Sequence, residues 1–461
     1  PRRPLVKTRN KAYLEELKYA DMPKVLKAVN AAQDTAWRIN EPVLKLITEL
    51  AKRDSELGGV PRATHYAIPE KPKDIDSNEE SRKKYRARAR SIHEANVNLT
   101  SQRISFLTVL ETAKKYAEYD EFFCPAQLDF RGRVYFMPQL NPQGPDWIKG
   151  LLEFSDGVAL GDYGLEWLKV HIANLFGVDK VSYSERVAWV DENTEMLCAI
   201  ADDPYDNLQW AEADKPFQAY AACFDLDLAL GSENPEEYIS RIPIALDGSC
   251  SGIQQLSMAF RDTVGGAAVN ILPSDKPSDI YQLVADATLA VLKELSAQIE
   301  PVAQSTQDGE KEVTPIAALA QWWLDFGITR KHTKRNCMTF PYGSKQRGFS
   351  DQILEDILNP HIKEHGDLKF NPMLLSNLLA KINYQSVKQI VLKASEAMDW
   401  MQQAARMVAK EGRPVCWTTP LGFPVVQNYL CTKEARVETS LAGERNSRVV
   451  LYNCVSVGVF Q

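Results

Sequence analysis

Apolar residues recur at every third or fourth position over much of this chain, which is the spacing of one buried face of an α-helix. The pattern covers residues 11–53 and 278–299, and helical sequence also fills 157–230 and 315–410. Such spacing over so much of a chain leaves little room for a large sheet. It therefore predicts an α+β protein that is mainly helical.

Short strands and turns are predicted where alternating apolar and polar residues lie between glycines and prolines. Residues 122–150 have this pattern, and residues 417–424 are hairpin-like. Residues 242–246 (Ile-Pro-Ile-Ala-Leu) predict a further strand, which runs into Asp247 and then into a helix at 251–260.

Composition limits the class of protein. The 461 residues are 44% hydrophobic and 25% charged, the balance of a globular protein with a packed core and a length that suggests about three domains. This excludes collagen, a disordered tail protein and a disulfide miniprotein. No apolar run reaches the ~18 residues of a membrane span. The 8 cysteines are spaced singly without a Cys-x-x-Cys pair, which favours a reducing compartment over a zinc ribbon.

Charge is distributed unevenly, although 54 basic and 61 acidic residues give a net charge of only −7. Residues 1–150 contain 27 basic and 20 acidic residues, whereas residues 151–250 contain 5 basic and 20 acidic residues. Residues 326–350 contain six basic residues and no acidic residue. Six of the basic residues in 1–150 lie within 82–90, after a predicted loop at 54–80. Basic surfaces suit polyphosphates, because neutralised phosphates release counterions. A solvated face is the alternative interpretation of any one run.

The first candidate site is the turn Asp247-Gly248-Ser249-Cys250-Ser251-Gly252. A carboxylate at the end of a strand, next to a glycine that lets an ion approach the backbone, can bind Mg²⁺. The same letters contain Gly-x-Cys-x-Gly, the pattern of a nucleophile elbow with Cys250 as the nucleophile. A tight turn without chemistry is the third interpretation, and these six residues leave all three open.

The second candidate is the segment 361–365, which matches the His-x-x-Glu-His pattern of zinc peptidases. His361 and His365 are four residues apart and can share a helix face, and Glu364 could activate a water molecule. Pro360 and Gly366 limit the helix to one or two turns. We therefore favour a solvated surface helix here.

The third candidate is the stretch 327–344, where Arg330 and Lys334 are four residues apart. On a helix their cations project from one face and repel each other unless an anion lies between them. A triphosphate is such an anion, because Arg binds two phosphate oxygens at once and Lys acts as a point charge or proton donor. Pro341 should end or kink the helix, close to Tyr342 on the same side.

Together these blocks resemble the single-subunit, bacteriophage-type DNA-directed RNA polymerases. Residues 247–254 resemble motif A of that family, and Arg330-x-x-x-Lys334 with Tyr342-Gly343 resembles its motif B. The other matching blocks are Asp129-Phe130-Arg131-Gly132-Arg133-Val134-Tyr135, Asn141-Pro142-Gln143-Gly144, Asp279-Ile280-Tyr281 and Trp417-x-x-Pro420-x-Gly422-Phe423-Pro424. The blocks occur in the family's order between about residues 10 and 445.

The resemblance implies a reaction and a role for each matching residue. An RNA 3′-hydroxyl would attack the α-phosphate of a ribonucleoside triphosphate on a DNA template. Asp247 and the Gly248 carbonyl would bind Mg²⁺, of which the full-length family enzyme uses two ions. Lys334 would contact the triphosphate and protonate the pyrophosphate, Arg330 would hold phosphate oxygens, and Tyr342 would sense the 2′ position of the sugar. The other substrate-binding residues that it implies are Gly343, Arg133 and Tyr281.

The resemblance also implies a right-hand architecture with part of the palm missing. We expect the end of an N-terminal domain at 1–33, a thumb-like helical region at 34–119, part of the palm at 120–262, fingers at 263–445 and an atypical, β-prone tail at 446–461.

Two departures from the family pattern bear on activity. The family's second metal-binding aspartate belongs to a His-Asp-Ser motif that this sequence lacks, and the resemblance fades after Arg445, so that residues 446–461 look foreign to the family. We therefore expect a truncated copy, a monomer in the host cytoplasm without membrane contact, which binds DNA, RNA and nucleotides but transcribes poorly. The alternatives are a non-catalytic nucleic-acid-binding remnant and a cysteine hydrolase that uses Cys250.

Overall fold

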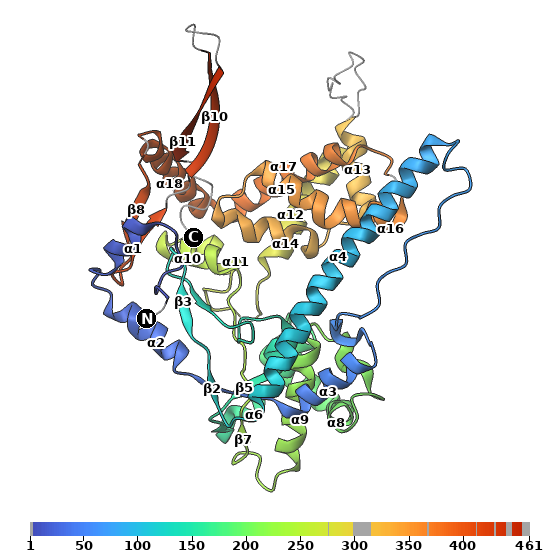
Figure 1. The fold of residues 1–461 in the computed structure, drawn as a ribbon, viewed down its shortest axis with the longest axis vertical. Coiled ribbons are helices and arrows are strands. Elements are labelled where there is room, and N and C mark those ends of the chain that lie inside the picture. The colour runs from blue at the N-terminus through green and yellow to red at the C-terminus, as the bar shows by residue number, and fades with distance from the viewer. Residues whose placement is uncertain are drawn as a thin grey trace. The chain divides into compact units, whose positions relative to one another are not determined.

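The computed structural model describes residues 3–274, 276–297, 315–366, 368–411, 413–427, 430–438 and 445–453. Helices make up most of these residues, and the strands form small sheets (Figure 1), which confirms the prediction of a mainly helical α+β protein. The chain divides into two compact units. Unit 1 runs to Leu246 and includes Pro420–Phe423, and unit 2 contains the chain from Asp247 apart from that short insertion.

The helices of unit 1 pack around one hydrophobic core, in which Trp210, Phe217 and Leu46 are at most 1% exposed. The helical prediction for residues 157–230 is confirmed, and residues 54–80 are a loop apart from one short turn and the start of α4. The elements are α1 (Lys11–Leu17), α2 (Pro23–Gln33), α3 (Glu41–Lys52), η1 (Leu57–Gly59), α4 (Glu79–Tyr116), α5 (Asp146–Gly150), α6 (Gly161–Leu175), α7 (Tyr183–Glu192), α8 (Thr194–Asp202), η2 (Leu208–Glu212) and α9 (Pro216–Gly231).

The strands of unit 1 are short and antiparallel. β1 (Ala36–Ile39) lies between β2 (Phe122–Phe123) and β5 (Leu152–Phe154), and β3 (Ala126–Leu128) pairs with β4 (Val134–Phe136). The strands predicted within 122–150 are therefore confirmed. The uninterrupted helical interpretation of 11–53 is wrong at β1, because Trp37 and Ile39 alternate into the core and their strand partners lie more than 80 residues further along the chain.

The β3–β4 hairpin carries the Asp129–Tyr135 motif. Gly132 turns the chain with a φ of +85°, and the Asp129 carboxylate accepts the main-chain N–H groups of Arg131 and Arg133 at 2.9 and 3.0 Å. A Cβ atom on Gly132 would lie 3.3 Å from the Phe423 ring. Two sequence blocks almost 300 residues apart thus meet within unit 1.

The strand predicted at residues 242–246 does not form. A strand is present earlier, at β7 (Ile239–Ser240), and it pairs with β6 (Val158–Ala159). Pro243 has no N–H to donate to a ladder, and Leu246 is 77% exposed. An apolar run becomes a strand only where another strand supplies hydrogen bonds, and none of the described strands pairs with this one.

Helix α4 is the longest element, with 38 residues that include the basic run at 82–90. Asn78 caps its first turn, and its carboxy-terminal half buries Phe106, Val109 and Leu110. The preceding loop is hydrogen-bonded to this helix, because the main-chain N–H and carbonyl of Tyr66 both bond to the side chain of Asn96.

Unit 2 has its own hydrophobic core around Trp323, Phe349 and Leu379. The predicted helices at 251–260, 278–299 and 315–410 are confirmed as α10 (Ser251–Ala259), α11 (Thr263–Ala268), α12 (Ile280–Ser296), α13 (Ile316–Phe326), α14 (Arg330–Thr339), η3 (Phe340–Tyr342), α15 (Gln346–Ile353), the π-helical η4 (Leu354–Leu358), α16 (Asn359–His365), α17 (Pro372–Ile390) and α18 (Leu392–Lys410).

Two hairpins follow the helices of unit 2. β8 (Val415–Thr418) pairs with β9 (Pro424–Gln427), as predicted, and β10 (Leu430–Glu438) pairs with β11 (Arg445–Asn453). The β-prone character of the tail is thereby confirmed as far as Asn453, whereas residues 454–461 lie outside the described residues. No helix among the described residues has both the length and the apolar character to cross a bilayer.

Candidate nucleotide site

The Asp247 turn opens unit 2 and leads into α10. The Asp247 side chain is exposed, and one of its carboxylate oxygens accepts the Gly248 N–H at 2.8 Å. Cys250 takes the left-handed conformation with a φ of +61°, which bends the chain sharply before α10 begins. The turn is anchored by Asn270, whose side chain donates to the Ser249 hydroxyl and to the Ser278 carbonyl, both at 2.8 Å.

The cationic helix α14 holds Arg330 and Lys334 over one aromatic ring. The Arg330 guanidinium carbon lies 5.4 Å and the Lys334 ammonium nitrogen 5.9 Å from the centroid of Tyr281. The prediction that both cations project from one helix face is confirmed. The ring's electron-rich face offsets part of the repulsion between them.

Tyr281 also joins the cationic helix to the Asp247 turn. Its side chain interacts with the Cys250 thiol, and its main-chain carbonyl accepts the Thr333 hydroxyl of α14 at 2.7 Å. Burial raises the pKa of the Tyr281 hydroxyl, so the phenol stays protonated and remains a donor. One side chain of α12 therefore touches both candidate segments.

Tyr342 lies against the start of α10. The helix α14 ends at Thr339, and Pro341 lies in the 3₁₀ turn η3, so the break predicted at this proline is confirmed. A Cβ atom on Gly252 would lie 2.9 Å from Pro341 Cγ and 3.6 Å from Tyr342 Cζ. Gly343 follows with a φ of +86°, in the left-handed conformation, and ends the turn η3.

Asp279 lies in one of the matching sequence blocks, but no role was predicted for it from the sequence. Its carboxylate caps the amino terminus of α12 and also accepts the Arg330 Nε–H at 2.6 Å, with the two side chains only 21% and 34% exposed. An acidic residue before an amphipathic helix signals the cap. Nothing local signals the ion pair, because Arg330 lies 51 residues further along the chain.

The chemistry of Cys250 does not suit a nucleophile. Burial raises the pKa of its thiol, which lowers the fraction of the reactive thiolate. His332 would be a base from the same region, but its Nδ1 accepts the Thr329 N–H in a helix cap, and burial together with Lys331 lowers the pKa of the ring. This geometry does not favour the cysteine hydrolase.

The histidines of the zinc-peptidase pattern belong to an aromatic cluster. The His361 and His365 rings stack with centroids 4.4 Å apart, and Phe326 lies edge-on to His361 at 5.3 Å. Within the described part of the chain, no three His, Cys, Asp or Glu side chains come together as a metal site.

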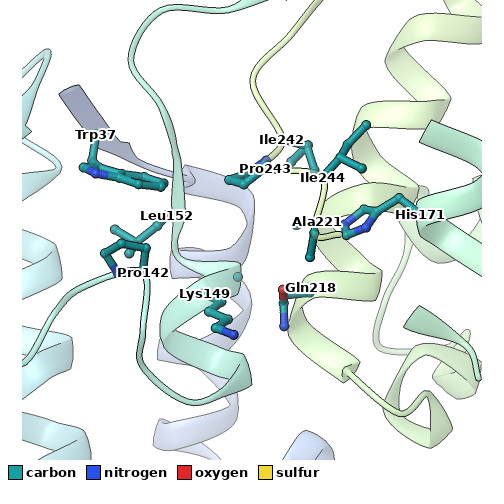
Figure 2. Close-up of a pocket in the computed structure, with 12 residues that line it drawn as sticks. Trp37, Pro142, Lys149, Leu152, His171, Gln218, Ala221, Ile242, Pro243 and Ile244 are labelled. Atoms are coloured by element: carbon teal, nitrogen blue, oxygen red, sulfur yellow. The ribbon is translucent and has the colours of Figure 1, made fainter. Parts of the chain in front are cut away.

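Arg133 and a small apolar cavity both belong to unit 1. Arg133 is exposed in the β3–β4 turn, so its predicted contact with nucleotide stays a prediction. The cavity has a volume of about 130 Å³ and mostly apolar walls, with Lys149, Gln218 and His171 as its polar lining (Figure 2). No residue of the candidate site lines it.

The arrangement in unit 2 defines the class of site. Two cations on one face of a helix, held by an aromatic ring that also touches a turn with an exposed carboxylate, suit a nucleoside triphosphate and its metal ion. In the sequence comparisons, the family described as DNA-dependent RNA polymerase matches residues 158–449. The chain belongs to this family, in its single-subunit, phage-type branch.

Named relatives support the assignment. The chain is 39% identical to the DNA-directed RNA polymerase of Enterobacteria phage T3, and 38% identical to T7 RNA polymerase of Escherichia phage T7, over 96% of its length. It is 36% identical to DNA-directed RNA polymerase 1, mitochondrial, of Arabidopsis thaliana over 90% of its length. It covers 52% of each of the two phage relatives and 41% of the plant relative, so it spans about half the length of the proteins it matches.

Proposed function

We propose that this chain contributes the nucleotide-binding and part of the catalytic surface for DNA-templated RNA synthesis. The reaction is attack of an RNA 3′-hydroxyl on the α-phosphate of a ribonucleoside triphosphate, with pyrophosphate as the leaving group. The observation that carries the proposal is the position of Tyr281, whose ring lies beneath Arg330 and Lys334 and whose side chain interacts with Cys250 of the Asp247 turn.

Arg330 and Lys334 would have different roles at the triphosphate. Asp279 engages Arg330 through Nε only, so both terminal nitrogens of the guanidinium can donate to phosphate oxygens. Lys334 is exposed, and no carboxylate of the described residues forms an ion pair with it. It can therefore neutralise the phosphates and donate a proton to the departing pyrophosphate. General-acid help of this kind is typically worth ~10²–10⁴-fold.

The Asp247 turn fits one Mg²⁺ ion that arrives with the nucleotide. Mg²⁺ is typically held by one or two carboxylates together with phosphate oxygens and water, and the turn offers the exposed carboxylate and the Gly248 carbonyl. When bound, the ion neutralises charge that develops on the phosphate oxygens. A two-ion mechanism needs a further carboxylate, so we expect slow RNA extension by this chain alone.

Tyr342 is our candidate for sugar recognition. Its ring contacts the start of α10 at Gly252, five residues after the metal-binding carboxylate, and its hydroxyl can form a hydrogen bond with a ribose 2′-hydroxyl. We expect Tyr342→Phe to reduce the preference for ribo- over deoxyribonucleotides in single-nucleotide incorporation. If Tyr342→Phe keeps the same preference for ribonucleotides as the unchanged protein, Tyr342 does not recognise the sugar.

The wider architecture that we propose is a right hand. The thumb would include α4, whose exposed basic residues at 83–90 can follow a phosphate backbone. The palm and the fingers would lie at 120–262 and 263–445. DNA template, RNA transcript and ribonucleoside triphosphates are the proposed partners of a monomeric chain in the host cytoplasm.

Nucleotide binding tests the site without requiring turnover. Lys334→Gln should weaken binding of a fluorescent ribonucleoside triphosphate with Mg²⁺ by about tenfold or more, the usual worth of a hydrogen bond to a charged group. Arg335→Gln is the matched control, because it removes the same charge from α14 at a side chain that pairs with Glu355 at 2.9 Å and with Asp356. Equal effects of the two substitutions would contradict the site.

Primer extension on an RNA–DNA scaffold then separates an enzyme from a binding remnant. We expect weak extension that depends on Mg²⁺ and disappears in Asp247→Asn. Nucleotide binding without any extension would favour the non-catalytic remnant.

A further inference from the structure

A chain of buried polar side chains lies beneath the cationic helix. The Asn336 amide of α14 donates to Gln352 Oε1 of α15 at 2.8 Å, and its oxygen accepts the Asn383 amide of α17 at 2.9 Å. The Asn383 oxygen in turn accepts the Thr288 hydroxyl of α12 at 2.9 Å. Thr288, Asn336 and Asn383 are each at most 1% exposed. These four residues, the Asn336 network, link α14 to three neighbouring helices.

Helix α14 has little apolar surface with which to fix its own rotation. Its buried residues are Thr333, Asn336 and Cys337, of which only the cysteine is apolar, and Met338 is 44% exposed. Hydrophobic packing tolerates small sliding and rolling movements, whereas a fully satisfied buried hydrogen-bond network permits one arrangement. The orientation of this helix must therefore come mainly from its polar contacts.

Orientation matters here because Lys334 and Asn336 lie nearly opposite each other on the helix. A roll of about 20° moves atoms on the helix surface, about 5–6 Å from the axis, by about 2 Å. That movement exceeds the ~1 Å misplacement that typically costs a reacting group ~10²-fold in rate.

We infer that the Asn336 network is a positioning device: it sets the rotation of α14 and thereby the place of Lys334 and Arg330 at the nucleotide. None of its members touches the nucleotide in this assignment. The consequence for nucleotide binding rests on the proposed function, whereas the effect on the helix does not.

Paired substitutions separate positioning from stability. Asn336→Leu or Asn383→Leu alone leaves the other amide buried without its partner, so each should lower the melting temperature. The double variant removes both amides and should regain most of that loss. The other two members of the network keep hydrogen-bond partners in the double variant. Gln352 also bonds to Thr339, and the Thr288 hydroxyl lies 3.5 Å from the Ser386 hydroxyl.

The first readout is alkylation of cysteine thiols by iodoacetamide, mapped by mass spectrometry on the full chain. Cys337 of α14 is 0% exposed, and so is Cys223 of α9, which serves as the internal control. If the network fixes the rotation, Cys337 should react at least about tenfold faster in the double variant while Cys223 stays at its original rate. Unchanged labelling of Cys337 in all three variants overturns the inference.

The second readout is the affinity for a fluorescent ribonucleoside triphosphate with Mg²⁺. The double variant should bind it about tenfold more weakly although its melting temperature has recovered. Affinity that recovers together with the melting temperature would show a merely structural role and overturn the inference. If Lys334→Gln does not weaken nucleotide binding, the proposed function is refuted. The labelling of Cys337 then still tests the inference, because it does not depend on the nucleotide.

Discussion

Replacing Gly252 by alanine tests the contact between α10 and η3. A Cβ atom there would lie 2.9 and 3.0 Å from two carbons of the Pro341 ring and 3.6 Å from Tyr342. Carbon atoms separate to about 3.5–4.0 Å at their optimum, so η3 must move by roughly 0.5–1 Å. The ring is rigid and Pro341 is buried, so this movement cannot be absorbed by one flexible side chain.

Two opposing contributions set the change in unfolding free energy for Gly252→Ala. Alanine in place of glycine stabilises a helix interior by up to about 1 kcal/mol, whereas overpacking typically costs about 1–3 kcal/mol. We expect Gly252→Ala to lose about 0–2 kcal/mol of unfolding free energy. Gly266→Ala in α11 is the matched control, because its nearest neighbours are 3.8 Å away, and it should keep the gain in helix propensity.

Urea denaturation followed by circular dichroism measures the difference between the two variants. Gly252→Ala should unfold at a lower urea concentration than Gly266→Ala, by about 1–3 kcal/mol in unfolding free energy. It should also lose discrimination between ribo- and deoxyribonucleotides, because Tyr342 moves with η3. A Gly252→Ala protein as stable as the control would refute the close contact and the reasoning built on it.

Three further outcomes follow from single contacts. Asp279→Asn keeps the cap of α12 but ends the ion pair, so urea denaturation should show a loss of about 1 kcal/mol that shrinks in high salt; a loss independent of salt would contradict the pairing. Burial lowers the pKa of His171 from 6.5 to about 4, so its stabilising effect is complete above pH 6.5 and is lost, by up to about 3 kcal/mol, as the pH falls toward 4. His171→Leu should therefore flatten the decline in stability over that range, and an unchanged slope would refute the assignment. Gly422→Ala should cost more than Gly59→Ala, because both glycines have positive φ but only Gly422 abuts the Asp21 carbonyl oxygen; equal losses of melting temperature would show that the contact is absent.

Local elements were predictable where the signal lies in consecutive residues. Asp279 before an amphipathic run marks the start of α12, and Pro341 marks the end of α14, since each acts through the neighbouring turn of backbone. The spacing of Arg330 and Lys334 likewise placed both cations on one face.

Predictions failed where an element depends on distant partners. β1 is a strand because strands more than 80 residues away pair with it, and residues 242–246 are not a strand because none of the described strands does. The ion pair of Arg330 with Asp279 and the contact of Tyr342 with Gly252 could not be predicted for the same reason.

By itself, the sequence determined the helical class, the family and the residue types that can meet a triphosphate, because these follow from periodicity and from motifs read along the chain. Only the tertiary structure decided that the Tyr281 ring lies beneath both cations of α14, and that buried amides link this helix to its neighbours. The physical reason is that a side chain finds partners through space, and which distant residues become neighbours is set by the packing of the whole unit.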